Sequence, residues 1–253
     1  MRIIINADDC GYSQSVNERI EDAIIRGRIT STTVMANMGD LDGAARLYKD
    51  YCEKISFGFH LNLTEGQPLL KNQQLLDMGF YIEKEGVVVF NGSPYRRKFL
   101  SKAAREGIYK EVLAQAEKII DSGIRLSHID SHHFIHQAFF MVPILPQLCD
   151  QLHIYKVRNY WNYYPSILHR ALKSCWSKSL LIQNKRIVLP KWFSSYEMFY
   201  DYNEKHNPLY HENDIVELMV HPGNPIYTRE EELLMGVNVI DKFMCQLINY
   251  NSI

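Results

Sequence analysis

The sequence predicts an α/β protein with a distorted (β/α) barrel, and three observations favour this fold. Short β-branched runs alternate with helical stretches along most of the chain, which is typical of parallel strands joined by crossover helices. The length of 253 residues is close to the roughly 250 residues of a (β/α) barrel. Ionisable side chains follow several of the predicted strands, where such folds place their sites. A doubly wound open sheet is the alternative.

The N-terminal part of the chain contains three predicted strands with two helices between them. Each strand is a short apolar or β-branched run bounded by polar residues. Ser15 and Glu18 have the spacing of a capping box, and Gly27 is typical of a helix end. The predicted elements are a strand at 2–6, a helix from 15 to about 26, a strand at 29–36, a helix at 41–50 and a strand at 55–63.

The remainder of the chain is less regular, although we expect one domain over residues 1–253. Irregular excursions are expected at about 64–106, which holds the basic cluster 96–98, and at 159–213. Thr228 and Glu231 again have the spacing of a capping box. The other predicted elements are helices at 108–121 and 139–152, strands at 125–131, 154–158 and 215–221, and a final helix from 228 to about 249.

The composition excludes several classes of protein. The 28 Lys and Arg residues balance 29 Asp and Glu residues, so there is no basic field to attract nucleic acid. The five cysteines are scattered, which argues against a disulfide framework and fits a reducing compartment. The N-terminal apolar stretch is too short for a signal peptide, and no run of about 18 apolar residues could span a membrane. We therefore expect a cytoplasmic protein without a nucleic-acid or membrane partner.

Carboxylates and imidazoles gather at the ends of the predicted strands. Two neighbouring aspartates, Asp8 and Asp9, follow the first strand, and adjacent carboxylates repel each other unless a cation or a proton lies with them. His60, Asn62 and Glu65 follow the third strand, and the segment HIDSHHFIH ends the strand after it. Since parallel strands end at the same edge of a sheet, we expect these groups to meet.

Such groups suit a divalent metal, because imidazole and carboxylate ligands bind zinc, iron, nickel, cobalt or manganese and a catalytic site leaves one position open. One aspartate and two histidines from three strands would form it. His132 is the favoured ligand of its segment because it shares a strand face with Asp130 and a helix face with His136. The strand period does not decide which aspartate binds the metal. The other aspartate would accept a proton from water.

Two further residues at strand ends have side chains suited to catalysis. His221 stands alone before a Pro-Gly pair, and an imidazole that titrates near neutral pH suits general acid catalysis on a leaving group. Arg158 would hold the free aspartate ionised through a bidentate pair. Both residues therefore belong to the predicted site.

Four segments resemble, in chain order, the signature segments of the YdjC-like carbohydrate deacetylase family, which includes chitooligosaccharide deacetylases. These segments frame most of the chain and are NADDCGYS, GFHLNLTEG, HIDSHHFIH and ELMVHPG. Family members commonly have NADDFGLS, so Cys10 and Tyr12 depart from that pattern. Phe134 stands where many members have another histidine or a polar residue, and this departure concerns the fit of the substrate more than the metal.

The resemblance implies a barrel of the polysaccharide-deacetylase or glycoside hydrolase-like type that removes the N-acetyl group from an amino sugar. It implies one divalent metal ion, for which we expect Mg or Zn, with Co, Ni or Mn as alternatives. We also expect a small carbohydrate as substrate, with a homodimer as an option. The implied metal ligands are Asp9, His60 and His132, the catalytic residues are Asp8 as base and His221 as acid with Arg158, and the expected substrate-binding residues are Asn62, Asp130 and His136.

Other functions stay open. Residues 151–196 contain aromatic side chains and eight basic residues but no Asp or Glu, so this segment would line the barrel mouth and, through Arg170 and Arg186, select an acidic sugar. A phosphoester or other amide hydrolase would use the same site, with a second metal held by His128, Asp130 and His136. A sugar-binding protein without activity is the remaining alternative.

Overall fold

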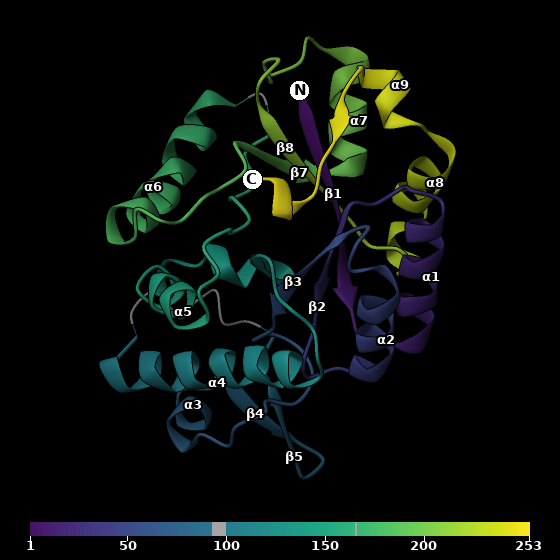
Figure 1. Ribbon diagram of the computed structural model, residues 1–253. Helices are drawn as coiled ribbons and strands as arrows, with labels where there is room; N and C mark the ends of the chain where they lie inside the picture. The colour runs from purple at the N-terminus through teal and green to yellow at the C-terminus, as the bar shows by residue number, and fades with distance from the viewer. Residues whose placement is uncertain (93–99, 165) are drawn as a thin grey trace.

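A computed structural model, which describes residues 1–92, 100–164 and 166–253, contains a curled parallel sheet surrounded by helices (Figure 1). The strands of this sheet are β1 (Arg2–Cys10), β2 (Ser31–Val34), β3 (Ser56–Leu61), β6 (Ile129–Ser131), β7 (Trp192–Ser195), β8 (Ile215–Val220) and β9 (Gln246–Leu247). Their order is β6-β3-β2-β1-β8-β7, and β9 also pairs with β1. The long first strand therefore lies in the middle of the sheet.

The strand order confirms the predicted barrel. From β1, the neighbours β2, β3 and β6 follow in chain order on one side, and β8 and β7 lie on the other. A barrel has this cyclic order because its last strand returns to the first, whereas a doubly wound sheet reverses direction at a switch point. The strand predicted at 154–158 is wrong. In its place, beside the three-residue strand β6, the described chain forms two isolated bridges, of Ile129 with Val157 and of Lys156 with Val188. The barrel is accordingly distorted at this point.

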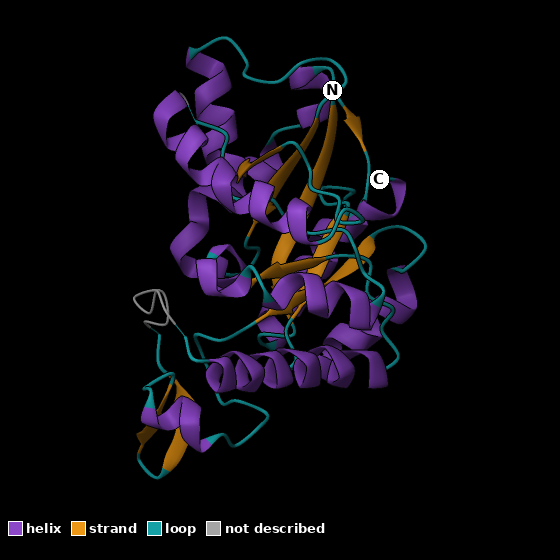
Figure 2. Cartoon of the chain, turned by 90° about the vertical axis from the view of Figure 1, so that its left-hand side faces the viewer, coloured by secondary structure: helices purple, strands orange, loops and turns teal. Residues whose placement is uncertain are grey.

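Most of the described helices pack around the sheet (Figures 1 and 2). They are α1 (Gln14–Ile25), α2 (Leu41–Tyr51), α3 (Gln73–Asp77), α4 (Lys102–Asp121), α5 (Ile144–Leu152), α6 (Ile167–Gln183), α7 (Tyr196–Lys205), α8 (Thr228–Gly236) and α9 (Val239–Phe243). The helices predicted near 15–26, 41–50 and 108–121 are confirmed, although Ser13 and not Ser15 caps α1. Within the described ranges, no helix is long and apolar enough to cross a membrane.

Both stretches for which the sequence predicts no regular structure contain helices and strands. Before α4, α3 precedes an antiparallel hairpin of β4 (Tyr81–Lys84) and β5 (Val87–Phe90), which lies below α4 in Figure 1. The stretch 159–213 contains α6, β7 and α7. The helix α3 and the strands have four or five residues each, too few to establish a hydrophobic period. The helices α6 and α7, with 17 and 10 residues, are long enough, and the sequence analysis missed them. The basic cluster at 96–98 lies outside the described residues.

The single long helix predicted for the C-terminal end is wrong. Helix α8 ends at Gly236, and Asn238 caps the short α9 by accepting a hydrogen bond from the backbone of Ile240 at 3.1 Å. Met244 then adopts a φ of 47°, which ends α9 before the chain enters β9. Gly236 and Asn238 explain the break, because both residue types favour helix ends over helix interiors.

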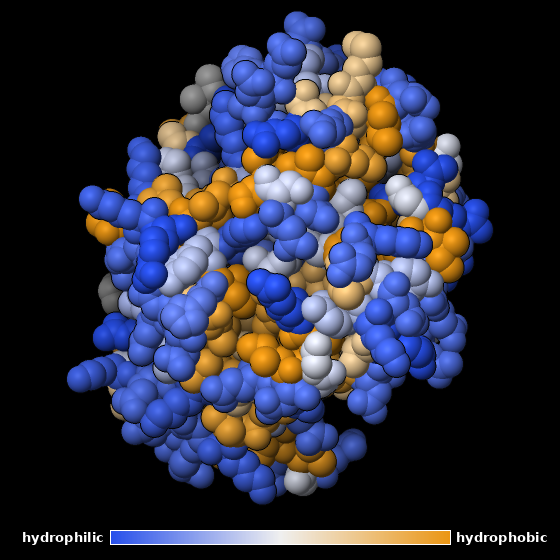
Figure 3. All heavy atoms as spheres, viewed as in Figure 1, coloured by the Kyte–Doolittle hydropathy of each residue, from blue (hydrophilic) through white to orange (hydrophobic). Residues whose placement is uncertain are grey.

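The sheet is apolar outside and polar inside. In β1, Ile3, Ile5 and Ala7 pack into the hydrophobic core beneath the helices. Asn6 and Asp8 alternate with these residues, as the strand period requires, and both are buried in the barrel interior. On the surface seen in Figure 3, hydrophilic residues form most of the rim, and hydrophobic residues gather in patches nearer the middle. The barrel interior, and not the apolar core, supplies the polar groups of the site.

The packing of His128 inside the barrel gives a test of this arrangement. Its ring stacks on Tyr250 with the centroids 3.6 Å apart, and a methyl group added at Gly58 would lie 2.4 Å from it. We expect Gly58→Ala to lower the free energy of unfolding by about 1–3 kcal/mol, the usual effect of overpacking a core. Urea unfolding measures this, with Gly236→Ala as control because a methyl group there meets nothing within 4 Å. Equal losses in the two variants would contradict the packing.

Candidate metal centre

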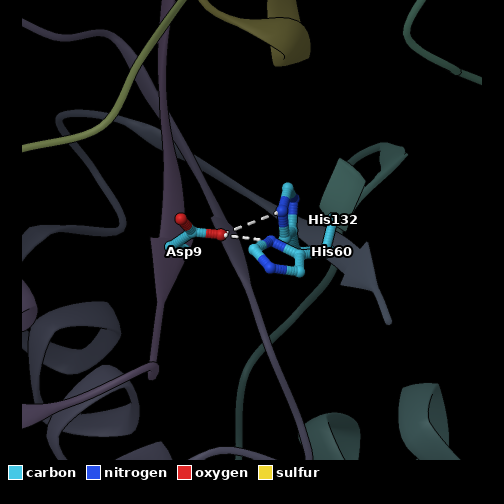
Figure 4. A group of neighbouring side chains, drawn as sticks. All are labelled: Asp9, His60 and His132. Carbon is cyan, nitrogen blue, oxygen red and sulfur yellow. Dashed lines mark hydrogen bonds and ion pairs between the residues drawn. The ribbon is translucent and has the colours of Figure 1, made fainter. Parts of the chain in front are cut away.

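Three side chains from different strands meet around one carboxylate oxygen. Oδ1 of Asp9 lies 2.9 Å from Nδ1 of His132 and 3.2 Å from Nε2 of His60 (Figure 4). Asp9 lies near the end of β1, His60 lies in β3, and His132 directly follows β6. All three side chains are buried. The structure thus brings together the three residues that the resemblance implies as metal ligands.

The backbone at the end of β1 explains how two neighbouring aspartates reach one cavity. In a regular strand, Asp8 and Asp9 would point to opposite faces. Asp9 instead has a φ of 68°, a left-handed conformation that is uncommon outside glycine. The register between β1 and β2 shifts at the same point, between Ala7 and Cys10. Both carboxylates consequently line the same cavity, which the strand period could not indicate.

The donor set fits a divalent cation. One carboxylate and two imidazoles, whose donor atoms lie within 4.8 Å of one another, are the ligands of many catalytic zinc and related sites. Nδ1 of His60 meets Oδ1 of Asp130 at 2.7 Å, an arrangement that orients a metal-binding imidazole. Burial lowers the pKa of His60, but Asp130 and Asp9 outweigh it and raise the pKa to about 10. A positive charge is therefore favoured at this point of the barrel.

Asp8 and Arg158 form a bidentate ion pair inside the barrel. Nη1 and Nη2 of Arg158 lie 2.7 and 2.6 Å from the two oxygens of Asp8, and Asn6 donates a further hydrogen bond to Asp8 at 2.9 Å. Burial raises the pKa of Asp8, but the charge and hydrogen bonds of Arg158 outweigh it and lower the pKa to about 2. Asp8 is thus ionised at neutral pH, as expected for the aspartate that does not bind the metal.

Arg158 also contacts two further carboxylates. Its Nη1 lies 2.8 Å from Asp130, and its Nε donates to Glu217 at 2.8 Å. The hydroxyl of Tyr250 donates to the other oxygen of Glu217 at 2.6 Å. Burial raises the pKa of Glu217 to about 7, because Arg158 and Tyr250 only partly oppose the loss of solvation. One guanidinium therefore connects three buried acids that lie on different strands or strand ends.

His221 faces Asp8 across a narrow gap. Its Nε2 lies 4.0 Å from Oδ2 of Asp8, and its Nδ1 lies 3.2 Å from Glu230. The ring stacks on Tyr227 with the centroids 4.3 Å apart. Burial lowers the pKa of His221, but Glu230 and the two neighbouring aspartates raise it above the ordinary value. The protonated imidazole, which can donate a proton, is the form that these contacts favour.

These groups lie at the floor of a cavity of about 760 Å³. The floor is acidic, whereas other parts of the wall are apolar or aromatic. Among the described residues, no lysine or arginine lines this cavity. The large apolar and aromatic residues that line it are Tyr12, Phe134, Trp161, Met198, Met219, Ile226 and Tyr227.

The three residues expected to bind the substrate are not among those that line the cavity, and their role in binding stays a prediction. Asn62 accepts hydrogen bonds from backbone amides of its own loop at 3.0 and 3.1 Å. Asp130 lies deeper, where it holds His60, and the buried ring of His136 bonds to Ser131 at 2.5 Å. Sequence spacing places residues on faces but does not give their depth, and these three lie behind the residues that reach the cavity.

The alternative metal site and the expected anion site are not assembled. Within the described ranges, His128, Asp130 and His136 do not form a common group of ligands, because His128 packs against Tyr250. Arg170 lies over the ring of Trp192, and Arg186 pairs with Asp150. Neither arginine is among the residues that line the cavity, so the selection of acidic sugars by this pair stays a prediction. Among the described aromatic residues of 151–196, Trp161 is the one that lines the cavity.

Two carboxylates at the site had no role in the sequence prediction. Oε2 of Glu65 lies 2.9 Å from Nε2 of His132, and Glu230 accepts hydrogen bonds from both the backbone and the ring of His221. Glu65 follows the same strand as His60, which was a usable signal. Glu230 lies within the segment that was interpreted as a capping box, so the sequence analysis gave it no role at the site.

Sequence comparisons relate this chain to one protein family and to several named relatives. A family model described as YdjC-like protein matches residues 2–239. Carbohydrate deacetylases of Geobacillus stearothermophilus and Vibrio cholerae serotype O1 are 38% and 34% identical to 58% and 61% of this chain. These alignments cover 56% and 57% of the relatives, so the chain spans little more than half the length of the curated relatives it matches.

A solved structure supports the fold alone. The crystal structure of a candidate cellobiose-phosphate cleavage protein from Enterococcus faecalis V583 has a TM-score of 0.78 with this chain, at 23% identity. The similarity covers 99% of this chain and 98% of that one. The curled sheet with its surrounding helices is therefore an arrangement seen in a complete experimental structure.

The buried Glu217 should make stability depend on pH. The pKa of Glu217 is about 7 in the folded protein, whereas its ordinary value is 4.5. Between pH 4.5 and pH 7 the carboxyl is therefore ionised in the unfolded chain but still protonated in the folded protein. The free energy of unfolding consequently falls as pH rises through this range. The loss approaches about 3 kcal/mol by the linkage relation. Urea unfolding at pH 5 and pH 8 would measure it. Glu217→Gln should reduce this pH dependence, whereas Glu212→Gln at an exposed position should not; identical slopes in both variants would contradict the assignment.

Proposed function

This chain belongs to the YdjC-like protein family, and on that premise we propose that it is a metal-dependent carbohydrate deacetylase. It would hydrolyse the N-acetyl group of an amino sugar or chitooligosaccharide and release acetate. The observation that carries the proposal is the separation of 4.0 Å between Asp8 and His221, beside the ligand group of Asp9, His60 and His132. Amide hydrolysis needs a base for water and an acid for the amine at one place.

The three ligands determine which cation the site would accept. Asp9, His60 and His132 would hold a divalent ion, which when bound polarises the amide carbonyl and lowers the pKa of water. Two of the three donor atoms are imidazole nitrogens, which suit zinc and neighbouring transition metals. Magnesium prefers oxygen ligands, so we place Zn, Co, Ni or Mn ahead of Mg for this site.

Asp8 and His221 would divide the proton transfers between them. Asp8 would take the proton of the attacking water, and its pKa of about 2 keeps it ionised at neutral pH. Such a carboxylate is a weak base, but the two bonds from Arg158 fix its position, and proximity offsets low basicity. His221, whose pKa is raised by Glu230 and the aspartates, would donate its proton to the departing amine.

The cavity above these groups has the size and chemistry for a sugar. Its volume of about 760 Å³ lies within the usual range of small-molecule sites, roughly 300–1,000 Å³. Phe134 and Trp161 pack edge to face with centroids 5.5 Å apart and both line the cavity. Aromatic faces pack against the apolar faces of pyranose rings, whose hydroxyl groups stay free for hydrogen bonds. We propose that these two rings form the wall on which the sugar lies.

The alternative functions find less support. A phosphoester hydrolase with two metals would need a second ligand group, and the trio considered for it, His128, Asp130 and His136, does not form one within the described ranges. A sugar-binding protein without activity would not need the arrangement of Asp8 and His221. A cytoplasmic location, the lack of a nucleic-acid partner and the option of a homodimer stay predictions.

Release of acetate tests the proposal directly. We expect metal-stripped protein to be inactive on N-acetylated mono- and oligosaccharides and to regain activity with Zn, Co, Ni or Mn. Asp8→Asn should lower kcat by about 100-fold or more, since positioned acid–base groups contribute roughly 10²–10⁴-fold. Asp42→Asn, at an exposed position of α2, is the control. If folded, metal-loaded wild type released no acetate from any sugar, the deacetylase would be rejected.

The aromatic wall gives a separate prediction. Removing the ring in Trp161→Ala should raise KM for chitooligosaccharides by about 10-fold, because aromatic contacts of this kind are worth roughly 0.5–1.5 kcal/mol beyond the area they bury. The value of kcat should change less, since Trp161 does not contact the acid or the base. Phe139→Ala is the control, because that ring is 65% exposed and lies outside the cavity. An unchanged KM would remove Trp161 from the proposed sugar site.

A further inference from the structure

The contacts of His132 point to a role for Glu65. We propose that Glu65 is a positioning residue that orients His132 for the metal, and that Tyr12 holds Glu65 in place. This inference rests on the proposed metal site, but it concerns two residues to which neither the sequence nor the comparisons assign a function. Both residues line the cavity at the rim of the ligand group.

His132 lies between two carboxylates. Its Nδ1 is 2.9 Å from Asp9, and its Nε2 is 2.9 Å from Oε2 of Glu65. A neutral imidazole carries a proton on one nitrogen and a lone pair on the other. A cation bound beside Asp9 would take the lone pair of Nδ1, so the proton of the neutral ring would lie on Nε2, where Glu65 is placed to accept it.

His60 has the same arrangement with the nitrogens exchanged. Asp130 accepts from its Nδ1 at 2.7 Å, so its Nε2 faces Asp9 at 3.2 Å. Each imidazole is therefore fixed by one carboxylate and turned toward Asp9 by it. The two carboxylates differ in burial, because Asp130 is fully buried whereas the side chain of Glu65 is 39% exposed. An exposed glutamate needs additional contacts to stay in one rotamer.

The structure supplies those contacts at both ends of Glu65. The hydroxyl of Tyr12 donates a hydrogen bond to Oε1 at 2.7 Å. At the backbone, the side chain of Asn62 accepts from the amide of Glu65 at 3.1 Å and donates to its carbonyl at 2.7 Å. The residue is thus held at its main chain by Asn62 and at its carboxylate by Tyr12. Asn62, which was expected to bind substrate, instead builds the loop that carries Glu65.

A second interpretation of the same residues makes the inference testable. Glu65, His132 and His133 could also group around an ion of their own, since their donor atoms lie within 4.8 Å of one another. His132 would then bind two ions, one through each nitrogen, and Nε2 could not carry a proton. The two interpretations predict different numbers of metal ions per chain, and only the positioning role is consistent with a hydrogen bond from Nε2 to Glu65.

Calorimetric titration of metal-stripped protein with zinc chloride would decide between them. We expect one ion per chain in wild type, and the same number in every variant. Glu65→Ala should raise the dissociation constant by about 10–100-fold, the usual effect of losing such a support. Glu65→Gln should have a smaller effect because its carbonyl oxygen can still accept from Nε2, and Tyr12→Phe should weaken binding about threefold to tenfold. Glu83→Gln, on the exposed part of β4, should leave the constant unchanged.

The outcomes that overturn the inference are distinct from failure of the proposed function. Two ions in wild type that fall to one in Glu65→Ala would establish the separate site and reject the positioning role. Unchanged affinity in both Glu65→Ala and Tyr12→Phe would also reject it. The visible spectrum of cobalt-loaded protein gives a second readout, which should change in Glu65→Ala if the ring of His132 turns. If Glu65→Ala fails to fold, Tyr12→Phe and Glu65→Gln carry the test. Zinc binding without release of acetate would reject the deacetylase and leave this inference standing.

Discussion

The site depends on one buried cation, Arg158, whose guanidinium contacts Asp8, Asp130 and Glu217. Each of these acids holds a further group. Asp8 faces His221, the proposed acid, Asp130 bonds to His60, a proposed metal ligand, and Glu217 binds the hydroxyl of Tyr250. Removing one partner of a buried ion pair typically costs about 3–5 kcal/mol because a charge is left uncompensated. A change at Arg158 would therefore affect the base, a metal ligand and the barrel interior at once.

Charge balance also explains how the chain tolerates two adjacent aspartates at the end of β1. Separate partners offset their mutual repulsion, since Arg158 pairs with Asp8 whereas His60 and His132 pair with Asp9. The two carboxylates are thus chemically different despite being neighbours. Asp8 keeps a fixed negative charge, and Asp9 lies where positive charge is favoured. A division of roles between base and ligand follows from this difference in surroundings.

The sequence indicated the barrel and most of the ligand group because both depend on local patterns. Alternating apolar runs predict parallel strands, and parallel strands bring their ends together, so one of the two aspartates could be expected to meet histidines of other strands. The choice of Asp9, His60 and His132 came from the family resemblance. The depth of a residue behind the cavity is a tertiary property, which is why Asn62 and Asp130 were assigned to the substrate. The contact between Glu65 and His132 spans 67 positions and follows no period. Such contacts depend on the folded shape and cannot be read from spacing.

One strained turn connects the metal ligand to the proposed sugar wall. His133 and Phe134 are consecutive residues with φ values of 51° and 55°, and left-handed non-glycine residues cost about 1–3 kcal/mol each. The turn persists because Phe134 packs on Trp161 and Phe193, and Thr64 bonds to His133 at 3.0 Å. It places His132 at the cavity floor and Phe134 in its wall. Because two short steps of the same backbone place both residues, a change that relaxes this turn would move the proposed metal ligand and the proposed sugar wall together.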